Sequence, residues 1–240
     1  EPNNEHSLAH NFVRTVFEDS KGHLLIGTYI GIQMYDPGTD NFTPLAKLED
    51  TGETLESNIN SFIERKNGEI WVSGNVLCKL DIKDHLLTVR KVDIAVTSPG
   101  SLFEDKKQNV WMAKGEEGVY QLTPDNQLTL HLSKDNGYVK SICEDQRGNI
   151  YVGSIRKGLF IYDKERKTFV PIDLKEKGEL PVCFLYSGIP NELYIGTDGK
   201  GVVIYNIRTH EISEYKFDNN YFDSGNSKRH SILKDNSGNL

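Results

Sequence analysis

The chain has 240 residues, a net charge of −7 and a pI near 5.5. Its basic residues are scattered rather than gathered in a stripe, so no nucleic-acid partner is expected for this segment. No window approaches the ~18 apolar residues of a membrane helix, and the polar start EPNNEHSLAHN is unlike a signal peptide.

A similar segment of eleven residues recurs along the chain. It reads EDSKGHLLIGT at 18–28, ERKNGEIWVSG at 64–74, EDKKQNVWMAK at 104–114, EDQRGNIYVGS at 144–154 and SGIPNELYIGT at 187–197. KDNSGNL at 234–240 matches the first part of the same segment. A large apolar residue anchors each full copy, at Leu25, Trp71, Trp111, Tyr151 and Tyr194. A period of about 40 residues is that of a propeller blade.

Each copy has the pattern of four strands. Alternating apolar residues precede a short polar turn, which predicts a β-hairpin. The turn contains Gly22, Gly68 or Gly148, with Gln108 and Asn191 as replacements, where a positive φ is needed. A small residue always follows the anchor by two positions, which indicates close approach by another backbone. These residues are Gly27, Ser73, Ala113, Gly153 and Gly196.

Two further strands complete each copy, the last carrying Phe42, Leu87, Leu128, Phe169 or Ile212. Because segments of helical period are absent, the sequence predicts an all-β fold, a β-propeller of four-stranded antiparallel blades. About five complete repeats are expected, at 12–48, 58–92, 98–133, 138–174 and 181–217, with a partial blade at 228–240.

The repeat resembles that of the two-component regulator propeller family, V-x-x-I-x-E-D-x-x-G-x-(I/L)-W-(I/V)-G-T-x-x-G-(L/V)-x-x-Y-D. SLAHNFVRTVFED at 7–19 is similar to the family's blade start, and YDPGTDNF at 35–42 to its blade end. Leu25 replaces the usual aromatic residue, the third copy lacks the turn glycine, and the fifth lacks the Glu-Asp pair.

The resemblance implies the periplasmic sensor ectodomain of a Bacteroidetes-type hybrid two-component system. The full-length receptor would then carry a histidine kinase and a membrane helix in parts beyond this segment, and would form a homodimer. We expect the chain to be a fragment of a larger propeller, its open edge covered by further blades or by another copy. A closed six-bladed ring is the alternative, but it needs EPNNEHSL to supply a strand.

Catalytic chemistry is not indicated. The seven histidines share no repeat position and have no ligand spacing, so neither a metal nor a cofactor is expected. The cysteines also lack metal-ligand spacing and are expected to be small apolar strand residues. They are Cys78, Cys143 and Cys183. The recurrent Glu-Asp pairs serve the blade, because Asp at a hairpin entrance bonds the turn backbone.

The candidate ligand-binding residues lie in the loops between second and third strands, which share one rim with the connections between blades. They are Tyr29, Asn75, Glu116, Glu117, Arg156, Lys157, Asp198 and Lys200. An aromatic platform among hydrogen-bonding charges would suit a sugar polymer, and the alternative is a solvated rim of mixed charge.

Three functions remain open at this point. The first is a non-catalytic sensor module that responds to glycan or oligosaccharide breakdown products. The second is a structural or partner-binding propeller of a cell-surface or secretion assembly. The third is a propeller lyase or lactonase, which should show His and carboxylate groups together on one rim.

Overall fold

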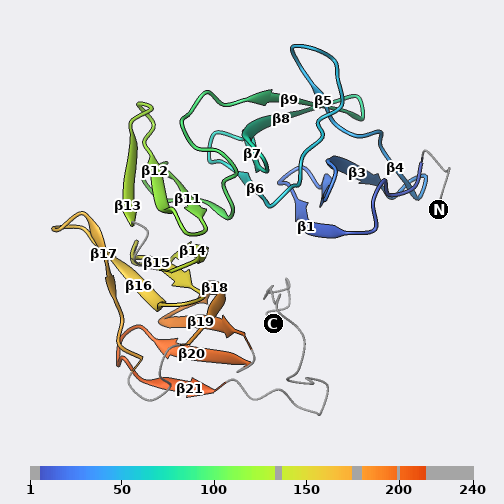
Figure 1. Cartoon of the computed structure of the whole chain (residues 1–240). Helices are drawn as coiled ribbons and strands as arrows, with labels where there is room; N and C mark the ends of the chain where they lie inside the picture. Colours follow the sequence, from blue (N-terminus) through green and yellow to red (C-terminus); the bar gives the residue numbers. More distant parts are fainter. Residues whose placement is uncertain (1–5, 133–136, 175–179, 199–200, 215–240) are drawn as a thin grey trace. The chain divides into compact units, whose positions relative to one another are not determined.

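A computed structural model describes residues 6–132, 137–174, 180–198 and 201–214. Every regular element in these ranges is a β-strand, which confirms the all-β class. No helix long and apolar enough to cross a membrane occurs in the described part of the chain. The strands form five sheets (Figure 1). The chain divides into two compact units, 1–104 and 105–240.

The first unit contains two complete sheets, of order β1-β2-β3-β4 and β5-β9-β8-β7-β6. Its strands are β1 (Val13–Glu18), β2 (Leu24–Thr28), β3 (Ile32–Asp36), β4 (Asn41–Phe42), β5 (Lys47–Leu48), β6 (Ser61–Glu64), β7 (Ile70–Ser73), β8 (Leu77–Lys83), β9 (Leu86–Lys91) and β10 (Leu102–Glu104). The short β5 pairs in parallel with β9, so the second sheet has one strand more than the predicted four.

The second unit contains the sheets β14-β15-β16-β17 and β18-β19-β20-β21, and β11, β12 and β13 follow β10 in the remaining sheet. Its strands are β11 (Val110–Lys114), β12 (Gly118–Leu122), β13 (Leu128–Leu132), β14 (Val139–Glu144), β15 (Ile150–Ser154), β16 (Gly158–Asp163), β17 (Thr168–Pro171), β18 (Val182–Ile189), β19 (Glu192–Thr197), β20 (Val202–Asn206) and β21 (Ile212–Glu214). Sequential antiparallel four-stranded sheets are propeller blades, as predicted. The predicted partial blade at 228–240 lies outside the described residues.

The turn between the first two strands of a blade takes a positive φ where the sequence predicts one. Gly22 has φ +84° and Gly148 has φ +79°. Where the glycine is replaced, the same conformation persists, with φ 66° at Gln108 and 61° at Asn191. The turn geometry is therefore a property of the blade, and glycine is its cheapest occupant.

Small residues on the second strand leave room for side chains of the next blade. A Cβ added at Gly27 would lie 2.6 Å from Cγ2 of Ile59, and one at Gly153 would lie 2.4 Å from Cγ1 of Val182. Both distances are below van der Waals contact, so these positions accept no larger side chain without movement. In each case the intruding side chain lies just before or at the start of the following blade's first strand.

The aspartate of the recurrent Glu-Asp pair caps its own hairpin. Oδ1 of Asp105 accepts the N–H groups of Lys107 (2.8 Å) and Asn109 (2.9 Å). Oδ2 accepts Nδ2 of Asn109 (2.8 Å) and Nε1 of Trp111 (2.9 Å). The two backbone bonds recur at Asp19 and Asp145. The predicted structural role is confirmed, and it extends to the polar atom of the buried anchor.

The glutamate at this repeat position, which in the second copy is followed by Arg65 rather than by Asp, bonds the preceding blade instead. The carboxylate of Glu64 accepts the N–H of Ser20 at 2.7 Å, and that of Glu104 accepts the N–H of Lys66 at 2.7 Å. Glu144 makes a longer contact of the same kind, 3.4 Å, with the turn of the blade before it. At Glu104–Asp105 and Glu144–Asp145 the aspartate therefore stabilises its own turn, and the glutamate joins successive blades.

The core of each unit lies between its sheets. Leu25, Ile32 and Val72 are nearly inaccessible in the first unit, as are Leu193 and Ile195 in the second. The cysteines are free and buried, in line with the sequence interpretation, and burial raises the pKa of each thiol.

Candidate functional site

The loops predicted to bind a ligand meet the blade starts. In each blade the loop after the second strand lies beside the residue before the first, because these strands are antiparallel. Three backbone hydrogen bonds hold the two segments together. They run from Tyr29 N to Phe12 O (3.2 Å), from Ile155 N to Tyr138 O (2.8 Å) and from Asp198 N to Pro181 O (3.0 Å). Within each unit, loop and blade start therefore form one rim.

The first unit carries an exposed aromatic group at this rim, the Tyr29 cluster (His10, Phe12 and Tyr29). The ring of Tyr29 lies 5.8 Å from that of His10 and 6.3 Å, edge-on, from that of Phe12. Phe12 and Tyr29 are about half exposed, at 49% and 55%. Large apolar rings left in solvent on a rigid rim are typical of a contact surface.

The other predicted residue of this unit, Asn75, is exposed in the loop between β7 and β8. Its N–H donates to Oγ of Ser57 (2.9 Å), and its carbonyl accepts the N–H of Ser98 (2.9 Å). These bonds fix the backbone and leave the exposed amide available to solvent or ligand.

In the second unit the structure brings two predicted residues together. Nη1 of Arg156 lies 2.9 Å from Oε1 of Glu116, an ion pair between the loops of neighbouring blades. Glu117 pairs instead with Lys114 (2.8 Å). Tyr120 also donates its hydroxyl proton to Glu117 (3.2 Å), and burial together with this bond raises the pKa of Tyr120.

The remaining predicted residues are not part of that pair. Lys157 is exposed, and its N–H donates to Oγ of Ser154 (3.2 Å). Asp198 is partly buried at the end of β19. Lys200 lies outside the described residues.

Sequence reasoning missed two aromatic residues at the rim. Tyr138 is 43% exposed, and its ring would lie 3.0 Å from a Cβ added at Gly115 in the neighbouring blade's loop. Tyr138 and Phe12 occupy the same repeat position, immediately before the first strand. Other blades have Asn58, Ser98 or Pro181 there. Variation between copies was the signal that could have found both.

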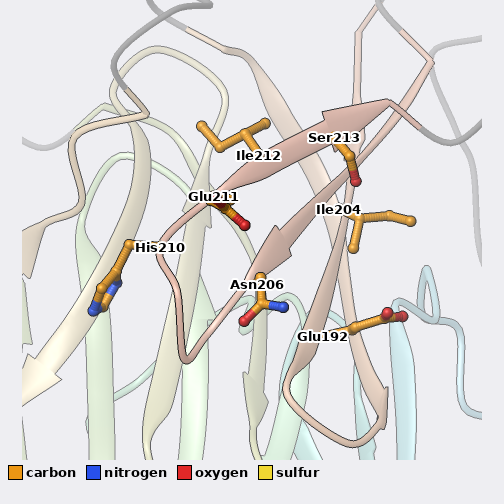
Figure 2. Close-up of a pocket in the computed structure, with 7 residues that line it drawn as sticks. All are labelled: Glu192, Ile204, Asn206, His210, Glu211, Ile212 and Ser213. Atoms are coloured by element: carbon orange, nitrogen blue, oxygen red, sulfur yellow. The ribbon is translucent and has the colours of Figure 1, made fainter.

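A pocket of about 520 Å³ on the last sheet offers no catalytic pair (Figure 2). Glu192 and His210 lie on opposite sides of Asn206 in this view. Nδ1 of His210 is 2.5 Å from the hydroxyl of Tyr205, and Oε2 of Glu192 accepts the hydroxyl proton of Tyr194 (2.8 Å). Both groups are thus engaged within their own blade.

No group of three or more His, Cys, Asp or Glu residues that could hold a metal ion occurs in the ranges that the structure describes. The exposed aromatic and charged groups at the rim are suited to binding by ring stacking and hydrogen bonding.

The family model "Two component regulator propeller" matches residues 7–29 and 133–156. These stretches cover two blade starts, each with its hairpin. Over these two stretches the chain is similar to two-component regulator propeller repeats. No curated protein matches this sequence.

Solved structures share the fold of this chain. The extracellular domain of BT4673 from B. thetaiotaomicron, described as a hybrid two component system, is 17% identical with a TM-score of 0.71, covering 90% of this chain and 31% of that one. Virginiamycin B lyase from Staphylococcus aureus is 12% identical with a TM-score of 0.67, covering 87% and 71%.

PorZ, a surface component of the type-IX secretion system of Porphyromonas gingivalis, is 12% identical with a TM-score of 0.63, covering 83% and 33%. The chain thus spans less than a third of the BT4673 extracellular domain and a third of PorZ. At these identities the likeness concerns the fold.

Proposed function

We propose that the chain is part of the extracytoplasmic ligand-sensing region of a hybrid two-component receptor, and that its ligand is a glycan or oligosaccharide. The repeat family and the likeness to the BT4673 extracellular domain support a sensor role. On this proposal the segment lies in the periplasm and binds without catalysis. The receptor is a homodimer whose kinase and membrane parts lie in other segments.

The Tyr29 cluster is the main support for a carbohydrate ligand. Phe12 and Tyr29 present half-exposed rings beside each other at the rim, and His10 extends the surface. The C–H face of a sugar ring packs on such a platform, while its hydroxyl groups bond polar neighbours. Loops on a rigid blade scaffold keep this surface in place before the ligand arrives.

Sensing requires more than binding. A ligand shifts an equilibrium between two receptor arrangements only by its difference in affinity for them. A rim of blade loops suits this requirement, because a ligand can contact the rim and whatever partner surface faces it in one arrangement.

The test is a thermal-shift screen of the 240-residue chain against digests of several polysaccharides. At a ligand concentration of ~100 Kd, binding to the folded state should add about 2.7 kcal/mol. We expect one digest to raise Tm in a concentration-dependent way. Tyr29→Ala should abolish that rise. The matched control Leu86→Ala removes another exposed apolar side chain, 63% accessible and remote in sequence, and should keep it.

The alternatives give different results. If a digest is shortened during incubation, the chain acts as a lyase or another enzyme rather than as a sensor. If the protein is folded and no digest raises Tm, a scaffold or partner-binding role replaces carbohydrate sensing. A Tm rise that survives Tyr29→Ala would place the ligand elsewhere on the chain.

A further inference from the structure

A second concave surface lies in the second unit, at the blade edge that carries the hairpin turns. It has a volume of about 750 Å³, within the ~300–1,000 Å³ range of ligand sites. Its walls are the turn 105–109, the outer strand β13, the turn after β14 and the turn after β16. We call it the Lys107 groove.

The Lys107 groove is positively charged although the chain as a whole is acidic. Its basic lining residues are Lys106, Lys107, Arg147, Lys164 and Lys167. The acidic lining residues are Asp105 and Glu144. Asp105 is 4% exposed and accepts four hydrogen bonds from its own hairpin. Glu144 accepts a backbone N–H. A net positive groove on a chain of net charge −7 selects an anionic ligand.

Two of the cations are held in position without being neutralised. Nζ of Lys106 donates to the carbonyl groups of Asp145 (3.2 Å) and Gln146 (2.5 Å). Nη2 of Arg147 donates to Oδ1 of Asn191 (2.7 Å). All three acceptors are uncharged, so both side chains keep their full positive charge. Because the protein orders them beforehand, an arriving anion bears less of the entropy cost.

The other three cations are free to move toward a ligand. Lys107, Lys164 and Lys167 are exposed, and their ammonium groups make no ion pair with any side chain in the described ranges. They come from two blades, on turns that lie about 60 residues apart in sequence. Oxyanions spaced along one ligand could therefore contact both walls.

The floor of the groove is aromatic and apolar. The ring of Tyr162 packs 5.1 Å from that of Trp111 and 5.2 Å from that of His131. Leu130, beside them on β13, is 46% exposed. A ligand with apolar C–H faces between its anionic groups fits this combination better than a bare polyanion does.

A peptide pairing with β13 is disfavoured. The carbonyl of His131 accepts the hydroxyl proton of Thr168 (3.4 Å), and its Nδ1 lies 3.0 Å from the carbonyl of Lys167. β13 and β17 also pack together at this point (Figure 1). The end of β13 is thus already covered by the neighbouring blade, which leaves its side-chain surface rather than its backbone for a ligand.

We propose that the Lys107 groove binds an acidic oligosaccharide, one that carries carboxylate or sulfate groups on successive sugars. The inference rests on the proposed carbohydrate ligand and adds a second contact surface, at the opposite edge of the blades from the rim loops. Basic residues on both walls contact the anionic groups, and Tyr162 and Leu130 contact the sugar rings.

The test compares two charge-reversed forms of the 240-residue chain by isothermal titration. The groove form carries Lys107→Glu, Lys164→Glu and Lys167→Glu. The control form changes three exposed lysines of the first unit by the same charge, Lys21→Glu, Lys47→Glu and Lys83→Glu. Probes of similar length are oligogalacturonate for carboxylate, carrageenan oligosaccharide for sulfate, neutral galacto-oligosaccharide, and oligoglutamate. Circular dichroism checks that both forms fold.

At least one acidic sugar should bind the unmodified chain, and the groove form should lose roughly tenfold or more in affinity, since three charge-assisted contacts become repulsions. The control form should bind like the unmodified chain. Affinity should also fall between ~0.1 and ~1 M salt, where the Debye length shrinks from ~10 to ~3 Å. Whether oligogalacturonate or the carrageenan oligosaccharide binds more tightly distinguishes carboxylate from sulfate.

Three results would overturn the proposal: equal loss in both forms, binding of oligoglutamate in preference to either acidic sugar, or no binding of any acidic sugar. Tyr29→Ala, titrated in parallel, separates the two surfaces. If neutral digests bind through Tyr29 while the groove form is unaffected, the groove fails and carbohydrate sensing stands. If acidic sugars bind through the groove and Tyr29→Ala leaves the affinity for every sugar unchanged, the assignment of the rim as a ligand site fails instead.

Discussion

Replacing Asp105 by asparagine should destabilise the second unit although the side chain keeps its shape. Asp105 accepts two backbone N–H groups through Oδ1 and two side-chain N–H groups through Oδ2. An asparagine has one acceptor oxygen, so its amide must face either pair of donors. Asn109 can rotate its own amide in response, but the indole of Trp111, 1% exposed, has no acceptor to offer. At least one buried donor is left unsatisfied.

The loss can be estimated from these contacts. An unsatisfied buried donor costs about 1–3 kcal/mol, and the remaining bonds lose the charge of their acceptor. The free energy of unfolding of Asp105→Asn should therefore fall by about 2–4 kcal/mol. This corresponds to a urea midpoint lower by roughly 1–2 M for a chain of this size.

Urea unfolding followed by tryptophan fluorescence measures this loss, and NMR of the indole N–H of Trp111 reports on the bond itself. Asp93→Asn is the control, since Asp93 is exposed and makes no side-chain hydrogen bond within the described residues. If Asp105→Asn unfolds within ~0.5 kcal/mol of that control, the reasoning about the cap is refuted, because surface changes are usually this small.

Three further results are expected. Gly153→Ala places a Cβ 2.4 Å from Val182 and should cost about 1–3 kcal/mol in urea unfolding; an unchanged midpoint would contradict the close approach. Burial opposes ionisation of Glu69, but hydrogen bonds from Lys79 and two neutral donors outweigh it and lower its pKa from 4.5 to about 2. The stability from this ionised group is present above pH 4.5 and is lost as pH falls through about 2. The free energy of unfolding of Glu69→Gln should therefore depend less on pH in the acid range than that of the unmodified chain. Parallel curves for the two proteins would exclude the effect. Burial raises the pKa of Cys78 to about 11 and of Cys143 to about 12. At ~pH 8 a disulfide reagent should therefore label these thiols only as the chain unfolds. Fast labelling of the folded protein would contradict their burial.

The blade itself could be predicted from the sequence because its signals are local. Period, anchor and turn residue lie within one hairpin, and the positive φ at Gln108 and Asn191 shows that position in the repeat predicts conformation better than residue type. The contacts of the chain start could not be predicted in this way. Gln33 is 2% exposed, and its Oε1 accepts the N–H of Ala9 (2.7 Å). That partner lies in a polar segment without strand pattern.

The candidate site shows the same contrast between local features, which the sequence predicts, and contacts between distant segments, which it does not. Loop membership of Tyr29, Asn75 and Glu117 follows from strand order, which the sequence predicts. The pairing of Glu116 with Arg156 depends on how two blades face each other, which no single repeat encodes. The Lys107 groove was missed for the same reason, because its cations lie far apart in sequence and only blade packing brings them together.

The glutamate that joins one blade to the preceding one also bears on how such a chain can change length in evolution. Glu64 and Glu104 each reach back to a backbone N–H in the turn before them, and a backbone donor is present whatever the side chain there. A duplicated blade thus brings the acceptor that its predecessor needs and presents the donor that its successor will use. Tandem duplication or deletion of blades that carry this glutamate preserves the bond, so the number of such repeats can change without leaving the junction unsatisfied. The fifth copy, with Ser187 at this position, is the exception.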